Sequence, residues 1–273
     1  IDAAPTSVEE FEADMQTAKD AGILPMMTYA KDGGTSFVFQ ALMANNSSAE
    51  DVQNWILQKS GTFDNQAAQD AASTLQDWNN KGYMPEGVNA VDASTALSRF
   101  CNGEGLFFPS GNWNLDTVAK ALGDDVQFFA FPGATSEDEP NVAANAGAFY
   151  GIPVNAKNRD AAAAFLDYTQ SAEAQQIIVD NSGYLPKSST LDLKANSALQ
   201  QSMFDAYADV LTSGHTSDFI NNATAGMQSS GLIPNFQLLL DNSITPQEFT
   251  KNVPKKRSGR NSFNLYAAFA SDA

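Results

Sequence analysis

One stretch in the first half of the chain, residues 100–113, reads F-C-N-G-E-G-L-F-F-P-S-G-N-W. The pair at 102–103 predicts the end of a helix, residues 106–108 predict a short apolar strand, and residues 109–111 predict a turn. This order places Trp113 at the end of a strand, where the next helix begins. An aromatic plate held there beside small residues suits a flat ligand with apolar C–H faces, of which a sugar ring is the commonest.

Elsewhere the chain alternates short apolar strands with striped helices. The first helix has Val8 and Phe11 on one face, and Gly22 ends it. Thr245 and Glu248 predict a capping box at the start of a late helix. Strands are predicted at 23–27, 105–108, 126–131 and 148–154, and helices at 8–21, 36–44, around 68–78, around 97–100, 161–168, 174–179 and over most of 196–273. This alternation predicts an α/β architecture.

Composition excludes several kinds of partner. The formal net charge is −17, so a nucleic-acid backbone would be repelled. No segment approaches the roughly 18 consecutive apolar residues that a membrane span requires. The single cysteine, Cys101, suits a buried structural thiol, and the single histidine, His215, cannot build a zinc cluster alone. The acids at 137–139 indicate a solvated loop rather than a calcium site, and we expect no metal and no cofactor.

Several short motifs follow one another over most of the chain. They are A-P-T-S-V-E-E-F at 4–11, K-D-A-G-I-L-P at 19–25, K-G-Y-M-P at 81–85, G-N-W at 111–113, A-G-A-F-Y-G-I-P-V-N-A-K-N-R-D-A-A-A-A-F-L at 146–166, S-A-E-A-Q at 171–175 and G-Y-L-P at 183–186. In this order they resemble extracellular solute-binding protein family 1, the substrate-binding lipoproteins of carbohydrate ABC transporters. Val8 departs from the pattern, which usually has tryptophan or another large residue there.

The resemblance implies a periplasmic-binding-protein-like fold of type II, with two lobes. In that family the helix matched by residues 4–11 follows a signal peptide, a lipidated cysteine and the first β-α-β units of the N-terminal lobe. A shortened version of the fold is therefore expected, lacking the N-terminal part of that lobe. Residues 1–131 and 188–273 would form a nearly complete, helix-rich C-terminal lobe, 132–140 a hinge or linker, and 141–187 a segment crossing to the N-terminal lobe. Without sheet neighbours, that segment would favour self-association or a missing partner piece.

The resemblance also implies a ligand held in a cleft between lobes, with hinge closure around it. Trp113 would stack on the ligand, flanked by Ser110 and Asn112, although core packing of Trp113 stays an alternative. Phe236 is a weaker candidate. Trp55 and Trp78 lie on helical stripes, which favours core packing for both.

Two further segments supply candidate ligand contacts. In K-D-G-G-T-S-F at 31–37, the glycines allow close backbone approach and the helix start exposes amides. A plain turn capped by a serine explains this segment equally well. From the crossing segment, the stretch 145–149 would face the cleft. The candidate residues are Asp32, Thr35, Ser36 and Phe37 in the first segment, and Asn145, Gly147 and Phe149 in the second.

The expected function is capture of a carbohydrate, most simply an oligosaccharide, by the binding component of an ABC importer. Its partners would be the sugar and the transporter's permease subunits, and a membrane would be contacted only through an N-terminal lipid anchor absent from this chain. The location would be the outer face of the cell membrane or the periplasm. A polyamine, phosphate or iron receptor of the same fold stays an alternative. Catalysis is not expected, because a glycosidase needs two carboxylates across a cleft and no motif places such a pair.

Overall fold

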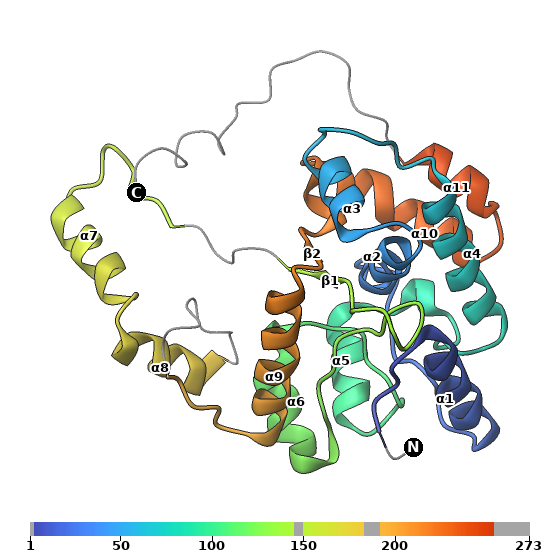
Figure 1. Cartoon of the computed structure of the whole chain (residues 1–273), viewed down its shortest axis with the longest axis horizontal. Helices are drawn as coiled ribbons and strands as arrows, with labels where there is room; N and C mark the ends of the chain where they lie inside the picture. Colours follow the sequence, from blue (N-terminus) through green and yellow to red (C-terminus); the bar gives the residue numbers. More distant parts are fainter. Residues whose placement is uncertain (1–2, 145–149, 183–191, 254–273) are drawn as a thin grey trace.

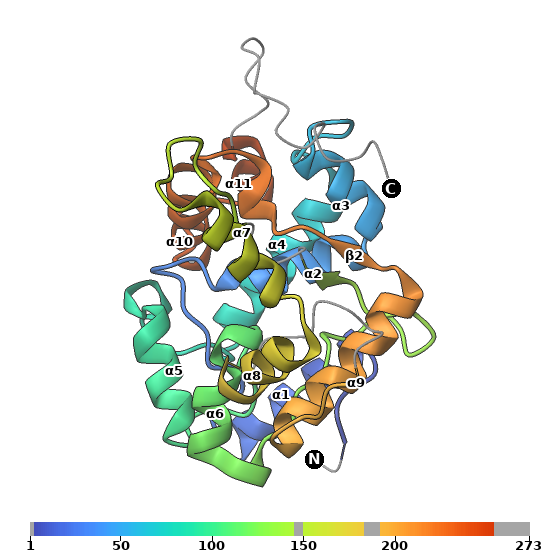
Figure 2. The ribbon, with the colours of Figure 1, turned by 90° about the vertical axis from the view of Figure 1, so that its left-hand side faces the viewer.

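The computed structural model describes residues 3–144, 150–182 and 192–253. Helices make up most of this part of the chain, and they fall into two groups (Figure 1). A helical body holds the elements from α1 to α6 and from α9 to α11. The remaining two helices, α7 (Arg159–Tyr168) and α8 (Ala172–Ser182), form an arm that stands beside the body. Figure 2, which looks onto the arm, shows both of its helices in front of the body.

The main core of the body lies between six helices. Buried side chains from both ends of the chain meet here, and the stripe predicted around 68–78 is confirmed, with Leu75 and Trp78 fully buried. The Trp78 indole N–H donates to Glu12 at 2.7 Å, which satisfies the polar end of the ring. The helices are α1 (Val8–Asp20), α2 (Thr35–Asn45), α3 (Ala49–Ile56), α4 (Gln66–Asn80), α10 (Ile233–Leu240) and α11 (Pro246–Asn252).

Local signals explain where these helices begin. The Ser7 hydroxyl accepts from Glu10 N–H, while the Glu10 carboxylate accepts from Thr6 N–H at 2.8 Å. The predicted capping box at Thr245 and Glu248 is confirmed, with both reciprocal hydrogen bonds present. Each bond satisfies an amide that the helix itself leaves without a partner.

A second core lies between α5 (Ala93–Cys101), α6 (Leu115–Leu122) and α9 (Ala198–Ser213). Leu115 and Val118 from α6 meet Leu199 and Met203 from α9 here. Cys101 is half-buried, and burial raises the pKa of its thiol, as suits a structural cysteine. Short helical turns complete the body: η1 (Val88–Ala90), η2 (Asn112–Asn114), η3 (Gly123–Asp125), η4 (Ile220–Ala223) and the π-helix η5 (Met227–Leu232).

Most of the strand predictions are wrong, because the described residues of those segments form no strand. Within the described residues the only strands are β1 (Val142–Ala143) and β2 (Thr216–Ser217), which pair in parallel. Segments 23–27 and 105–108 do run side by side, but they form one isolated bridge, Met26 to Phe107. On its other side, Met26 donates through its N–H to the carbonyl of Tyr83. Segments 126–131 and 150–154 contain no strand, and 148–149 lie outside the described residues.

The predicted hinge at 132–140 is tied to the body at both ends. Val8 N–H donates to the carbonyl of Gly133 at 3.1 Å. The Asn45 side chain donates to Pro132 O at 2.9 Å and accepts from the amide of Asn141 at 2.9 Å, so one α2 residue bridges the two ends of this loop. The division into lobes stays a prediction. None of the helices in the described ranges is long and apolar enough to cross a membrane.

Candidate ligand-binding site

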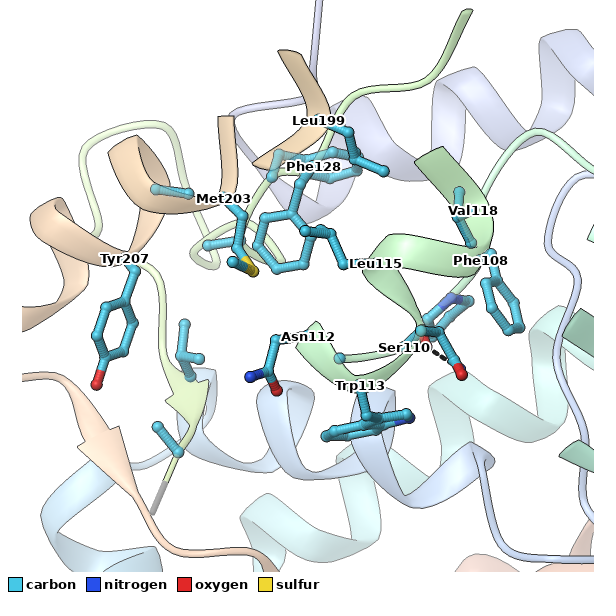
Figure 3. Close-up of a pocket in the computed structure, with 18 of the residues that line it drawn as sticks. Phe108, Ser110, Asn112, Trp113, Leu115, Val118, Phe128, Leu199, Met203 and Tyr207 are labelled. Carbon is cyan, nitrogen blue, oxygen red and sulfur yellow. Dashed lines mark hydrogen bonds between the residues drawn. The ribbon is translucent and has the colours of Figure 1, made fainter. Parts of the chain in front are cut away.

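A cavity of about 1920 Å³ lies between the body and the arm. Its body side is formed by the loop 105–114, by α6 and by α9, and its arm side includes Phe165 and Tyr168 of α7. A pocket for one drug-sized molecule usually measures about 300–1,000 Å³, so this space is wide enough for a ligand of several rings. Figure 3 shows the body side, with Trp113 and Asn112 at one edge and Tyr207 of α9 across from them.

Trp113 is held at the cavity edge by two other aromatic rings. Its ring centroid lies 5.5 Å from that of Phe37 on α2 and 6.2 Å from that of Phe219, which directly precedes η4. Phe37 and Phe219 are themselves 6.1 Å apart, so the three rings form one patch. The Trp113 side chain nevertheless keeps 43% of its surface exposed. This exposure favours the ligand-stacking interpretation over core packing, because a core tryptophan such as Trp78 has none.

Gly111 explains the shape of the turn before Trp113. A Cβ at this position would overlap the Trp113 ring, so the indole folds back onto the bare backbone of Gly111. The glycine of the G-N-W motif is therefore needed for space, since its backbone is in the extended region that any residue can adopt.

The polar groups of the site come from the same turn. The amide of Asn112 points into the cavity, and the Ser110 hydroxyl accepts from the Asn114 amide at 2.9 Å (Figure 3). Among the described residues that line the cavity, Asp125 is the only charged one. The surface offered to a ligand is thus aromatic, amide-bearing and nearly neutral.

The loop at 31–37 contributes one side chain to the cavity, Phe37. Asp32 lies outside the lining, and its carboxylate accepts from Ala93 N–H at 2.9 Å. Beside it, Lys31 pairs with Asp92 at 3.1 Å, and the pKa of Asp92 is well below its usual range because its carboxylate also accepts from Thr95 and Ser94. These contacts hold the loop to the start of α5.

Three predicted contacts are enclosed by the protein. Thr35 and Ser36 are buried in the first turn of α2, whose N-cap is Gly34, so the predicted serine cap is wrong. Phe236 is fully buried, with its ring centroid 5.2 Å from that of Phe39 and 4.8 Å from that of Phe249. This corrects its assignment as a ligand contact, because α10 turns that face toward the main core. Asn145, Gly147 and Phe149 lie outside the described residues.

The structure adds residues that sequence reasoning missed. Phe219, Gly111 and Tyr207 join Ser110, Asn112, Trp113 and Phe37 at the cavity. Phe219 lies in a segment predicted as helix, and no local pattern connects it with Trp113. Only the folded chain brings β2 and α2 together beside the G-N-W turn.

The chain matches the profile of one protein family over residues 1–204, and that family is described as bacterial extracellular solute-binding proteins. The chain belongs to this family. The resemblance found in the ordered motifs is thereby confirmed. A comparison with curated protein sequences gives no significant match.

Solved structures of sugar-binding proteins share the fold. The similar structures include a chitin oligosaccharide binding protein, with a TM-score of 0.78 and 18% identity over 92% of this chain and 63% of its own. RafE in complex with raffinose has a TM-score of 0.71 and 14% identity, and the match covers 92% of this chain and 65% of RafE. A sugar transporter protein from Bacillus licheniformis in complex with stachyose has a TM-score of 0.67 and 11% identity, with the same coverage of 92% of this chain and 65% of its own. The chain thus spans just under two thirds of their length, and these likenesses confirm the predicted fold class.

Proposed function

We propose that this chain captures a neutral carbohydrate, most simply an oligosaccharide, at the cavity between body and arm. The observation that carries the proposal is the chemistry of the lining, in which an exposed aromatic patch sits beside amide side chains and Asp125 is the single charged residue among the described ones. Sugar rings present apolar C–H faces to aromatic rings and hydroxyl groups to amides, so this lining complements them. Sugar-binding proteins among the structures of the same fold support the proposal.

Each residue at the site has a distinct role in this proposal. Trp113 supplies the stacking face, since it is the most exposed ring of the patch. Asn112 both donates to and accepts from sugar hydroxyls through its amide. Ser110 and Tyr207 add hydroxyl groups at the two sides of the cavity.

A charged solute suits this lining poorly. A polyamine receptor requires several carboxylates around the ligand, and a phosphate or iron receptor requires buried charged groups of its own. Catalysis of glycoside hydrolysis requires two carboxylates across the bond that is cut. The described part of the cavity offers only Asp125, which disfavours all of these alternatives.

The wider role that we propose is the extracytoplasmic binding component of an ABC importer. Family membership supports a position outside the cytoplasm, where such proteins meet their solutes. Delivery to permease subunits, and attachment through a lipid anchor, follow from the family resemblance alone and stay proposals.

Calorimetric titration of the 273-residue chain tests the binding proposal. The panel should contain chito-oligosaccharides, xylo-oligosaccharides, raffinose and stachyose, with spermidine and inorganic phosphate as charged competitors. We expect one sugar class to bind, and Trp113→Ala to weaken that binding by about tenfold or more, as for a central aromatic contact.

Trp55→Ala is the matched control, because Trp55 packs on Phe63 at 5.0 Å and lies outside the cavity lining. Its sugar affinity should equal that of the parent chain. Saturable binding of spermidine or phosphate with no response to any sugar would refute the proposal. Equal losses in the two tryptophan variants would instead remove Trp113 from the site.

A further inference from the structure

Gln40 is a buried polar residue on the face of α2 that also carries Phe37, one turn earlier. Only 2% of its surface is exposed. Burying a side-chain amide is unfavourable unless its donors and its acceptor find partners. All of the hydrogen bonds of the Gln40 side chain go to one short segment, residues 217–220.

These hydrogen bonds bracket Phe219 on both sides. Before it, the Gln40 amide nitrogen donates to the Ser217 hydroxyl at 2.9 Å and to the Asp218 carbonyl at 2.6 Å. After it, the Gln40 amide oxygen accepts from Ile220 N–H at 2.9 Å. A glutamine head carries both donors and an acceptor, so one side chain can fix the backbone before and after a single residue.

Other contacts leave the segment little freedom in the folded chain. The Gln53 side chain on α3 accepts from Asp218 N–H at 2.6 Å, and the Asp218 carboxylate accepts from Phe219 N–H at 2.7 Å. Ser217 also belongs to β2, which pairs with β1. Gln40 is the member of this network that links the segment directly to the helix carrying Phe37.

The consequence of this arrangement is the direction of the Phe219 ring. Its backbone is held in place, and its ring meets Phe37 at 6.1 Å and Trp113 at 6.2 Å. Among the described contacts, the Gln40 bonds are the only hydrogen bonds that join α2 to residues 217–220. Trp113 is half-exposed and rests on the backbone of Gly111, and these two rings are its aromatic neighbours, so they contribute to its orientation.

We propose that Gln40 is a positioning residue of the binding site, which holds Phe219 against Phe37 and so sets the orientation of Trp113. This inference rests on the proposed function where it concerns affinity, but its structural part does not. Gln40 lies outside the cavity lining, so the role proposed for it is indirect.

Fluorine NMR of the 5-fluorotryptophan-labelled chain tests the structural part without any ligand. The three tryptophans give three resonances, and Trp113→Phe assigns the one that matters. Phe219→Leu should shift the Trp113 resonance, because it removes a neighbouring ring. Gln40→Leu should shift the same resonance in the same direction, and it should leave those of Trp55 and Trp78 in place.

Gln76→Leu is the matched control. Gln76 is a partly buried glutamine on α4 that donates to the carbonyls of Leu239 and Ile244, away from the cavity. This variant should lower the melting temperature as Gln40→Leu does, yet leave the Trp113 resonance unshifted. Ser217→Ala removes only one of the Gln40 bonds, and it provides a mild variant in case Gln40→Leu does not fold. It should produce a smaller shift of the same sign.

Titration with the sugar found for the parent chain separates the two proposals. Gln40→Leu and Phe219→Leu should each weaken binding by about three- to tenfold, as expected for loss of one aromatic contact. The double variant should be no weaker than Phe219→Leu alone. A shifted Trp113 resonance without any sugar binding would contradict the proposed function only. An unshifted resonance in Ser217→Ala and in folded Gln40→Leu would overturn the positioning role, whatever sugar binds.

Discussion

Helix α4 of the body and helix α7 of the arm differ in how far their apolar stripes are buried. In α4 of the body, the striped residues Ala68, Leu75 and Trp78 have no exposed surface. In α7 of the arm, the stripe of Phe165 and Tyr168 leaves 64% and 45% of those side chains exposed, and the helix has no buried residue. An apolar stripe therefore predicts a helix and its inward face, while burial also requires a second element to cover that face.

The arm concentrates exposed apolar surface beside the cavity. Large exposed side chains in the arm are Phe165, Tyr168 and Ile177, and those in the segment that leads to it are Tyr150 and Val154. Folded chains seldom leave such a group uncovered without a use for it. Tyr150, Phe165, Tyr168 and Ile177 all line the cavity, so part of this surface faces the proposed ligand.

Hydrogen exchange provides the first test of the difference between α4 and α7. The α4 amides should be protected up to the level of global unfolding, and those of α7 should exchange roughly a thousandfold faster or more, because few buried contacts oppose local opening of α7. Mass-spectrometric exchange on peptides covering 66–80 and 159–168 measures the difference. Equal protection of the two peptides would show that the arm and the body unfold as one cooperative unit.

A matched pair of phenylalanine-to-alanine substitutions, one in the body and one in the arm, provides the second test. Phe39 on α2 is fully buried, and its ring centroid lies 5.6 Å from that of Phe63 and 5.4 Å from that of Phe249. Phe165 is mostly exposed. Phe39→Ala should lower the free energy of unfolding by about 3–5 kcal/mol, and Phe165→Ala should change it by about 0.5 kcal/mol or less.

Urea denaturation followed by circular dichroism measures both values. The slope of the free energy against urea should be the same in the two variants, since neither truncation changes the surface exposed on unfolding by much. A loss for Phe165→Ala comparable with that for Phe39→Ala would mean that the arm is packed against something in solution.

Sequence patterns predicted the helices of the body and of the arm better than the long-range contacts that these helices make. The capping residues Thr245 and Glu248 and the residues of the α4 stripe are each only a few positions apart, so both patterns can be recognised directly along the chain. The strand predictions failed because a ladder depends on distant partners, and segments 23–27 and 105–108 meet at only one isolated bridge, Met26 to Phe107. Trp113 could be found from its turn, but Phe219 and Gln40 could not, since their contacts join α2 to the segment after β2.

The third prediction compares two helix starts. The hydroxyl of Thr245 accepts from Glu248 N–H at 3.2 Å at the start of α11, and that of Ser171 accepts from Ala174 N–H at 3.2 Å at the start of α8. Removing either hydroxyl should cost its own helix about 0.5–2 kcal/mol. Thr245→Ala should move the urea midpoint, while Ser171→Ala should leave the midpoint unchanged and raise exchange only within 172–182. A midpoint shift of equal size in both variants would contradict a separately opening arm.

The smallest expected effect is on how the stability of the chain changes at acidic pH. Thr245 donates to the Glu248 carboxylate through its N–H and its hydroxyl, and these bonds lower the pKa of Glu248 from its usual 4.5. Because the folded-state pKa is the lower one, the stabilising contribution is complete above about pH 4.5, and it is lost as the pH falls through the folded-state value. Glu248→Gln should therefore flatten the decline in urea midpoint between pH 5 and pH 3 slightly, since its amide does not titrate. An identical decline in the parent chain and in Glu248→Gln would show that this exposed cap adds nothing to the acid sensitivity of the body, and that other carboxylates cause it.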